Sequence, residues 1–431
     1  MESPEPPPRL VREIGVVGLT VYGVGAILGA GVYALIGAAA GIAGESLWLA
    51  FLLSALIALL TGLSYAELAT LFPLAGAEYH FVQNGFGSIR LAFIAGWALI
   101  LGAATAVATV ALSFAGYLED ITGVPEALSA FLLIGVLSAI NFVGIRQSTS
   151  LNVVLTAIEA GGLLVIVALG LTQGLDAFVP PPPGEPAAIT SAAGLLFFSY
   201  LGFEHIANVA EESRNPQRIV PRALLGAIVI STLLYVLVAL AALALVSPQE
   251  LAGSSAPLAL VASRALGGLG ETALAVVALF ATTNTALLQL VASSRLVYGM
   301  ARERALPLAL TDINPSTHTP GSAVVLLMLV SWLFLPLGSI RLVGSLASFA
   351  LLFVFALVNL ALIRLRYSAP TANRPFRSPI SIGRLPVLAS LGVLTTAGTA
   401  LVLGLDVIII GGLMLAAGLI ASFILPAWPK R

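Results

Sequence analysis

Long apolar runs limit what this chain can fold into more than any other feature. An α-helix rises about 1.5 Å per residue, so a run of ~20 apolar residues spans the hydrocarbon core of a bilayer. Only 9% of the 431 residues are charged, whereas 59% are hydrophobic. Soluble domains carry ~25% charged residues, so this chain has too little charge for a water-facing surface. The composition predicts a multi-pass helical membrane protein embedded in lipid and excludes a soluble enzyme, a nucleic-acid-binding protein and a disordered chain.

The apolar runs predict twelve transmembrane helices with no soluble domain between them. They cover residues 14–41, 46–72, 89–117, 126–143, 150–172, 190–212, 222–246, 268–300, 321–338, 342–364, 386–404 and 407–427. Residues 1–13 are polar and rich in proline, which predicts a cytoplasmic tail. The segment 173–189 contains four consecutive prolines and predicts a stiff, extended outer loop.

The basic residues orient the predicted spans. With the N-terminus in the cytoplasm, every Lys and Arg except Arg264 and Arg341 falls in an inner segment. Such asymmetry is typical of membrane proteins, whose cytoplasmic loops are rich in Lys and Arg. It also supports the number of spans, because omitting one span would move every later loop to the opposite side of the membrane. The pattern predicts a protein of the cytoplasmic membrane with both termini in the cytoplasm. The net charge of −1 and the absence of cysteine indicate no bulk electrostatic partner, no disulfide and no thiolate metal site.

Glycines interrupt the first span. They occur at positions 23, 25, 29 and 31, and each lowers helix stability by ~1 kcal/mol relative to alanine. Gly25 and Gly29 also form a GxxxG pattern, which is typical of close packing between membrane helices. A broken helix and a packing motif are both compatible with this segment.

The sixth span is also interrupted. Gly202 lies in the middle of this span, close to the ionisable residues Glu204 and His205. Corresponding interruptions five spans apart are the sequence signature of an inverted-repeat transporter with its binding site at the two breaks.

The orientation gives the two breaks opposite hydrogen-bonding character. The outer half of span 1 begins near Ala30 and Gly31, so its free N–H groups and positive dipole end suit a carboxylate. The outer half of span 6 ends near Phe198 and Ser199, and its free carbonyls, with that of Ile27, suit an ammonium group. The predicted pocket is therefore complementary to the zwitterion of an α-amino acid.

Several motifs along the chain belong together. They are GAILGAGVY at 25–33, YAELA at 65–69, PLAGAEY at 73–79, FFSYLGFE at 197–204, AEESRNPQR at 210–218, PR at 221–222, SRLVYGMARERALP at 294–307 and TP at 319–320. With these motifs the chain resembles the amino acid–polyamine–organocation transporter superfamily over nearly its whole length. The resemblance implies an all-α integral membrane fold with a five-plus-five inverted repeat, broken helices 1 and 6 and two appended helices. Residues 14–172 would then form the first repeat, 190–366 the second, and 367–431 helices 11 and 12 with the C-terminal tail.

The resemblance also implies roles for backbone groups at both breaks. The implied carboxylate-binding residues are Gly29, Ala30 and Gly31, and the implied amino-binding carbonyls belong to Ile27, Phe198, Ser199 and Leu201. Phe198 resembles the aromatic lid that closes over the substrate in relatives. A lipid-facing aromatic side chain is the alternative interpretation of Phe198.

Glu159 and Glu204 are the clearest carboxyl groups inside the predicted spans, and intramembrane carboxyls are functional candidates by default. Proton-coupled relatives often carry a lysine where Glu159 aligns, beside the place where sodium-coupled relatives bind Na⁺. Glu159 is therefore a candidate proton carrier, a candidate Na⁺ ligand together with Thr283 and Asn284, or a structural hydrogen-bond donor to span 8. Glu204 is a candidate to titrate during transport or to link span 6 to its neighbours.

The third span lines the pocket in this superfamily. Gly102, Ala106, Thr109 and Ser113 recur there at helical spacing without an acidic residue. This wall favours a neutral amino acid over a cationic one or a polyamine. Close packing against span 8 or span 10 is the alternative role of this face.

Glu211 closes span 6 at the predicted cytoplasmic end, beside Glu212 and Arg214. These charges predict either a gate formed by ion pairs with inner arginines or a solvated helix end.

A secondary active amino acid transporter, with H⁺ or Na⁺ as coupling ion and no other cofactor, is the function these features favour. Three dispersed histidines supply too few ligands for a metal site. No nucleotide-binding motif occurs, and Glu204 and His205 diverge by about 100° on a helix, which argues against a catalytic pair. Sodium-coupled or exchange transport of a cationic amino acid or polyamine, and a sensor or channel on the same scaffold, remain alternatives. Spans 11 and 12 are compatible with a monomer or a homodimer.

Overall fold

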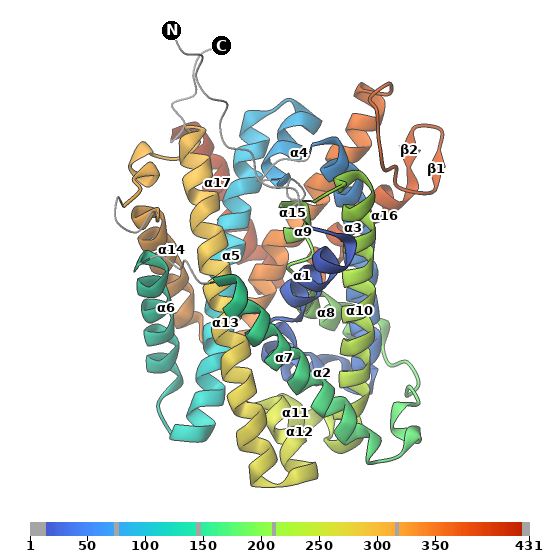
Figure 1. The fold of residues 1–431 in the computed structure, drawn as a ribbon, viewed down its shortest axis with the longest axis vertical. Helices are drawn as coiled ribbons and strands as arrows, with labels where there is room; N and C mark the ends of the chain where they lie inside the picture. The colour runs from blue at the N-terminus through green and yellow to red at the C-terminus, as the bar shows by residue number, and fades with distance from the viewer. Residues whose placement is uncertain (1–13, 73–76, 144–147, 209–212, 315–318, 425–431) are drawn as a thin grey trace.

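The computed structural model describes residues 14–72, 77–143, 148–208, 213–314 and 319–424 as a helical bundle (Figure 1). The long helices are α3 (Leu47–Leu71), α5 (Ile89–Thr122), α6 (Glu126–Val143), α7 (Ser148–Leu171), α10 (Pro216–Leu245), α13 (Gly268–Arg302), α15 (Ile340–Ser368) and α17 (Leu405–Ile424). The medium helices are α1 (Val16–Leu28), α2 (Gly31–Ala43), α8 (Pro186–Leu196), α14 (Gly321–Phe334) and α16 (Val387–Leu401).

Short elements connect these helices. They are α4 (Ala77–Phe86), α9 (His205–Asn208), α11 (Pro248–Gly253), α12 (Pro257–Leu266), the 3-10 turns η1 (Gly44–Ser46), η2 (Leu175–Phe178), η3 (Phe197–Tyr200), η5 (Leu308–Thr311) and η6 (Leu335–Leu337), and the hairpin β1 (Ser381–Ile382) with β2 (Leu385–Pro386). The two strands pair antiparallel, with Ser381 opposite Pro386. Of these, α4, α11 and α12 are helices between the predicted spans.

The described residues include eight helical segments that are long and apolar enough to cross a membrane. They are Gly31–Leu71, Ile89–Thr122, Val154–Leu171, Pro186–Ala207, Pro216–Leu245, Gly268–Arg302, Ile340–Ser368 and Leu405–Ile424. Five shorter apolar helices accompany them. The predicted all-α membrane class is confirmed, whereas the number of spans and the repeat relation stay predictions.

Two of the predicted spans are broken helices. Residues Gly29 and Ala30 separate α1 from α2, and the segment from η3 to Glu204 separates α8 from α9. Gly202 has a φ of +116°, and a Cβ atom there would collide with the backbone of Ala26 in α1. Only glycine fits such a conformation and such a close approach. The two breaks therefore meet in the middle of the bundle (Figure 1).

An aromatic cluster holds the second break against its neighbours. The buried ring of Tyr65 in α3 contacts Phe81, Phe203 and Phe355 edge-to-face, with ring centroids 5.5–5.8 Å apart. These rings come from α4, the turn after η3, and α15. Edge-to-face contacts stabilise such clusters beyond area burial, so the turn at Phe203 is well fixed.

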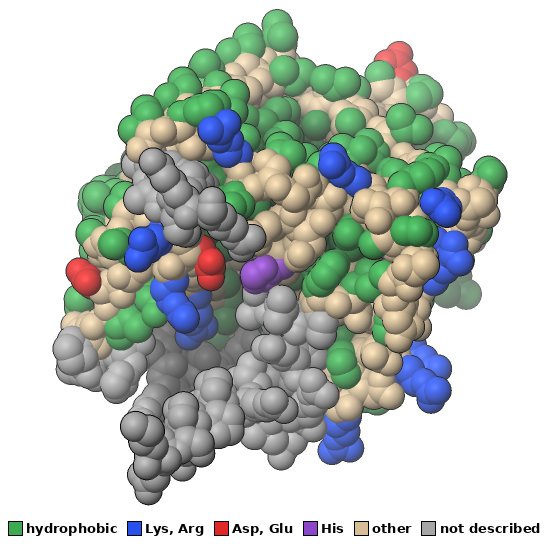
Figure 2. Space-filling view, turned by 90° about the horizontal axis from the view of Figure 1, so that it is seen from above, with side chains coloured by type: hydrophobic (Ala, Val, Ile, Leu, Met, Phe, Trp, Pro, Cys, Tyr) green, Lys and Arg blue, Asp and Glu red, His purple; other side chains and the backbone are tan. Residues whose placement is uncertain are grey.

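The two ends of the bundle differ. The helix α4 and the hairpin lie at one end, which is called the α4 end below, and α11 and α12 lie at the opposite end (Figure 1). Figure 2 shows the α4 end with arginine side chains spread over it and a hollow bordered by acidic, basic and histidine side chains.

Candidate functional site

A cavity of about 910 Å³ begins at the two helix breaks. Ala30 and Gly202 line its inner part, and Arg302 and Glu303 at the C-terminal end of α13 line its outer part. Side chains of α5, α13 and α15 complete the wall. The cavity therefore connects the middle of the bundle with the hollow at the α4 end (Figure 2). Small-molecule sites are typically of this size and placement, between helices of a bundle.

The first break brings the N-terminus of α2 to the cavity. Gly29, Ala30 and Gly31, the predicted carboxylate-binding residues, all line it. The Ala30 N–H donates to Oγ1 of Thr285 in α13 at 2.8 Å. The first turn of α2 contains no acidic side chain, so its positive dipole end is available to an anion.

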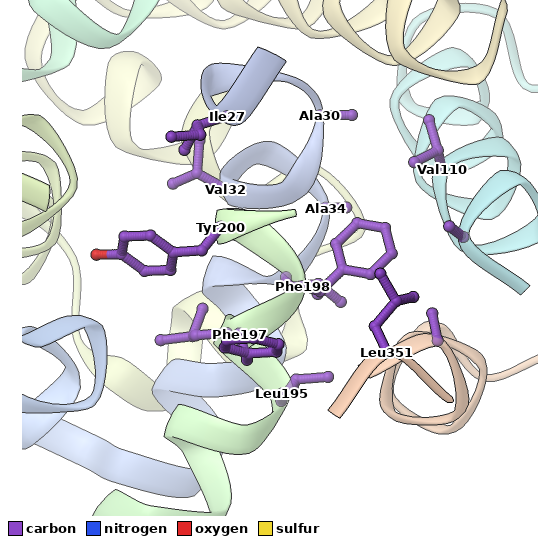
Figure 3. Close-up of a cluster of buried hydrophobic side chains, with 14 of the residues drawn as sticks. Ile27, Ala30, Val32, Ala34, Val110, Leu195, Phe197, Phe198, Tyr200 and Leu351 are labelled. Atoms are coloured by element: carbon purple, nitrogen blue, oxygen red, sulfur yellow. The ribbon is translucent and has the colours of Figure 1, made fainter. Parts of the chain in front are cut away.

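The second break supplies carbonyl groups and an aromatic ring. Of the four residues predicted to bind an amino group, Ile27, Phe198 and Leu201 line the cavity. Phe198 projects from η3 toward Leu351 of α15 and toward Val110 of α5 (Figure 3). Its side chain is buried, so it faces the protein interior rather than lipid.

Ser199 occupies a different position from its neighbours. Its Cα packs closely against Gly31, where an added Cβ atom would lie 2.6 Å away, and it does not line the cavity. Its carbonyl accepts a hydrogen bond from the hydroxyl of Tyr235 in α10 at 3.0 Å. The same hydroxyl donates to the carbonyl of Ile27 at 2.6 Å. Tyr235 thus joins the end of α1 to η3, and sequence reasoning missed it. A single tyrosine within the apolar segment 222–246 was the available signal.

The cavity-lining face of α5 overlaps the predicted wall at Ala106 but does not include Gly102, Thr109 or Ser113. Leu99, Ala103, Ala106 and Val110 line the cavity. Of the predicted residues Gly102, Ala106 and Thr109, Gly102 packs against Leu351 and Ala350, and Thr109 packs beside Gly344. Both therefore face α15, which corresponds to the predicted span 10, and close packing explains their small side chains.

Glu159 of α7 is fully buried beside the first break. Its Oε1 accepts a hydrogen bond from the side-chain amide of Asn284 at 3.1 Å, and its backbone carbonyl accepts one from Tyr33 of α2 at 2.7 Å. Its Oε2 has no hydrogen-bond partner among the described residues. Asn284 also lines the cavity, whereas Thr283 lies about 100° further round α13. The structure thus brings Glu159 and Asn284 of the predicted coupling set together.

Glu204 caps the second break. Its Oε2 accepts the N–H of Gly202 at 2.8 Å, so the carboxyl group satisfies a backbone donor that the break leaves open. Glu204 lines the cavity, as do His205 and Glu78 of α4. Glu78 accepts a hydrogen bond from Tyr65 at 3.2 Å. Sequence reasoning missed Glu78 as a cavity residue, because it lies in a loop segment between predicted spans.

The predicted gate residue Glu211 lies outside the described residues. Within the described ranges, no group of three or more His, Asp or Glu side chains is placed to hold a metal ion.

The family model for amino acid permeases matches residues 14–426 of the chain. The chain belongs to the amino acid permease family. The permease is 28% identical to the branched-chain amino acid permease BcaP of Bacillus subtilis, over 96% of this chain and 93% of that protein. It is 32% identical to the inner membrane transport protein YbaT of Escherichia coli, over 83% and 84% of the two chains. It is also 31% identical to the chloroplastic cationic amino acid transporter 9 of Arabidopsis thaliana, over 71% of this chain and 58% of that protein.

The family assignment identifies a multi-pass membrane protein of amino acid transport rather than an enzyme. It also agrees with the predicted superfamily, which rested on motifs spread over nearly the whole chain.

Proposed function

We propose that this permease is a secondary active transporter that moves a neutral amino acid across the cytoplasmic membrane by alternating access. The observation that carries the proposal is that the N-terminus of α2 lines the same cavity as Ile27 and Phe198, at the ends of the two broken segments. Amide donors suit the substrate carboxylate and carbonyl acceptors suit its ammonium group. The proposed carboxylate ligands are the backbone groups of Gly29, Ala30 and Gly31.

The cavity wall supports a neutral side chain. Ala106 and Val110 of α5, Phe198 of η3 and Leu351 of α15 surround the inner cavity with apolar groups. A cationic side chain there would lose hydration without a counter-charge. The name of the Bacillus relative, a branched-chain amino acid permease, agrees with this choice.

A cationic amino acid is the second candidate substrate. Glu78 and Glu204 line the same cavity nearer the α4 end, and the Arabidopsis relative is named a cationic amino acid transporter. Their carboxyl groups would attract a cationic substrate on its way through the cavity.

We propose that Glu159 carries the coupling proton. A carboxylate without a cation is costly in an apolar interior, and the second oxygen of Glu159 has no hydrogen-bond partner among the described residues. This favours a protonated carboxyl group that exchanges its proton when the cavity admits water. Sodium coupling through Glu159 and Asn284 is the competing possibility.

The proposed architecture has twelve spans, a five-plus-five inverted repeat, and both termini in the cytoplasm. The distribution of basic residues supports this orientation, which makes the α4 end cytoplasmic.

Uptake into proteoliposomes tests the function. We expect accumulation of a radiolabelled neutral amino acid above equilibrium when a pH gradient is imposed. Equilibration without accumulation would indicate a channel or sensor, and accumulation driven by a sodium gradient alone would support sodium coupling. Preferential accumulation of arginine or lysine would support the second candidate substrate.

Two variants of α5 test the cavity itself. Ala106→Leu fills the wall and should abolish uptake of large side chains. Thr109→Val, which lies three residues away but faces α15, should leave uptake intact. Equal uptake by both variants would contradict the proposed cavity.

Glu159→Gln tests the coupling. This variant keeps an acceptor for Asn284 but cannot release a proton, so we expect loss of pH-driven accumulation with exchange retained. A variant that keeps the full pH dependence of uptake would exclude Glu159 as the proton carrier.

A further inference from the structure

One hydroxyl group lies where the substrate carboxylate is proposed to bind. Oγ1 of Thr285 accepts the N–H of Ala30 at 2.8 Å, across 255 residues of sequence. Both residues line the cavity. An N–H group makes one strong hydrogen bond at a time. A carboxylate that binds this amide must therefore take the place of the Thr285 hydroxyl.

Gly29 makes room for this contact. A Cβ atom at position 29 would lie 2.6 Å from Oγ1 and 3.3 Å from Cγ2 of Thr285. Real Cβ atoms do not approach an oxygen so closely, so any larger residue would push the threonine away from Ala30. The close approach of Thr285 therefore requires glycine here.

The turn of α13 that carries Thr285 is anchored from its other side. Asn284 donates to Glu159 of α7 at 3.1 Å. The hydrogen bond between Asn284 and Glu159 fixes the orientation of this turn of α13. The Thr285 hydroxyl is therefore directed toward Ala30 before any ligand binds.

We propose that the Thr285 hydroxyl is a built-in substitute for the substrate carboxylate, which occupies the Ala30 N–H whenever substrate has left. This inference rests on the proposed function, because it assumes that Ala30 contributes to the carboxylate site. The substitute satisfies a backbone donor that would otherwise be unpaired when the cavity closes without substrate. Thr285 thereby eases the return of the unloaded transporter and competes with substrate for binding.

Thr285→Val tests the proposal, since valine keeps the shape of threonine but removes the hydroxyl. We expect amino acid affinity to rise roughly two- to tenfold, the effect of one neutral hydrogen bond. Net uptake, which needs the unloaded return, should fall severalfold. Exchange of labelled for unlabelled amino acid, which does not need that return, should be retained.

Two control variants accompany the test. Thr285→Ser keeps the hydroxyl and should behave as the wild type. Thr282→Val lies one turn earlier on α13, where the hydroxyl is buried and donates to the carbonyls of Ala278 and Leu279 in its own helix. It should leave the ratio of exchange to net uptake unchanged.

Opposite results would overturn the proposal. Weaker binding by Thr285→Val, or an equal fall in exchange and net uptake, would make the hydroxyl a substrate ligand or a structural group. If Thr285→Val does not fold, Thr285→Ala is measured instead. Failure of both variants while Thr285→Ser folds would assign the hydroxyl to the fold and overturn the proposal.

The wild type separates this inference from the proposed function. If wild-type protein neither binds nor exchanges any amino acid, the proposed function fails and the substitute role fails with it. If the wild type exchanges and Thr285→Val keeps the wild-type ratio of exchange to net uptake, only the role of Thr285 is contradicted.

Discussion

Tyr235 is the residue that most directly joins the two broken helices. Its fully buried hydroxyl donates to Ile27 at the end of α1 and to Ser199 in η3. A carbonyl that is fixed in this way keeps a second lone pair for a ligand. Tyr235 therefore fixes the direction of the Ile27 carbonyl without lining the cavity itself.

Removing that hydroxyl should affect both stability and transport. We expect Tyr235→Phe to lower the free energy of unfolding by about 1 kcal/mol and to raise the KM for uptake severalfold. Thermal unfolding in detergent and uptake kinetics measure the two effects. Tyr200→Phe is the matched control, because its hydroxyl bonds to the carbonyl of Phe51 at 3.1 Å. An equal rise in KM for both variants would remove the special role of Tyr235.

Glu78 is expected to make stability depend on pH. It lies in α4, outside the membrane-spanning helices. Burial and, to a smaller extent, the nearby charge of Glu204 raise the pKa of Glu78 from 4.5 to about 7, against the lowering effect of hydrogen bonds from the backbone and from Tyr65. The folded state therefore binds this proton more tightly than the unfolded state. Its contribution to stability is complete below pH 4.5 and is lost as the pH rises through about 7.

Glu78→Gln should flatten that part of the pH profile of the melting temperature. Measurements between pH 4.5 and 8 check this, with the exposed carboxyl of Glu45 as the control in Glu45→Gln. An unchanged slope in Glu78→Gln would show that another group titrates.

At the scale of elements, one buried carboxylate connects three parts of the α4 end. Glu67 in α3 accepts from Arg366 of α15 at 2.6 and 2.7 Å and from the backbone N–H of Ser378 at 2.8 Å. Arg374 lies 3.2 Å from the same carboxylate. All three charged side chains are at most 8% exposed. This network joins α3 and α15 to the segment that leads into the hairpin.

Breaking this network should be costly. Glu67→Gln leaves two buried guanidinium groups without a carboxylate, so we expect a loss of about 3–5 kcal/mol in the free energy of unfolding. The control is Glu250→Gln, which breaks the exposed pair of Glu250 and Arg264 and should leave the melting temperature near that of the wild type. A small shift for Glu67→Gln would show that water or another anion replaces the carboxylate.

Sequence reasoning predicts features that local residues determine better than features that contacts between distant residues determine. The breaks at Gly29 and Gly202 were predicted because two glycine-containing interruptions recur five spans apart. Glycine alone is not sufficient, since Gly23 and Gly25 lie inside the continuous helix α1. The pairing of Glu67 with Arg366 joins residues 299 positions apart, and no local pattern encodes such a contact. On α5, the predicted wall and the cavity lining share Ala106, whereas Ala103 lines the cavity in place of Gly102. Gly102 and Ala103 are both small, so the sequence pattern does not distinguish them. Only contact with α15 decides which of them faces the cavity.

At the scale of the whole molecule, the apolar runs were sufficient to predict a helical membrane fold. The short helices α4, α11 and α12 were not predicted, because their sequences are too short for a span and too mixed for a clear helical period. In α11, the capping box of Ser247 and Glu250 was the available signal.

The predicted orientation of the bundle can be tested with single cysteines, because the chain contains no cysteine of its own to compete for the label. We expect an impermeant maleimide to label Gln173→Cys in intact cells and to label Thr371→Cys only after permeabilisation. Both positions are exposed. Labelling with the opposite sidedness would invert the proposed topology.

The cavity that runs from Ala30 to Arg302 also has a pharmacological consequence. An amino acid carrying a bulky extension would fit with its zwitterion at the two breaks and its extension toward the α4 end. With the α4 end facing the cytoplasm, as proposed above, such a compound would reach the transporter from the cytoplasm and hold it in one conformation. It would then inhibit uptake non-competitively with respect to external amino acid, and its potency would depend on how well it enters the cell.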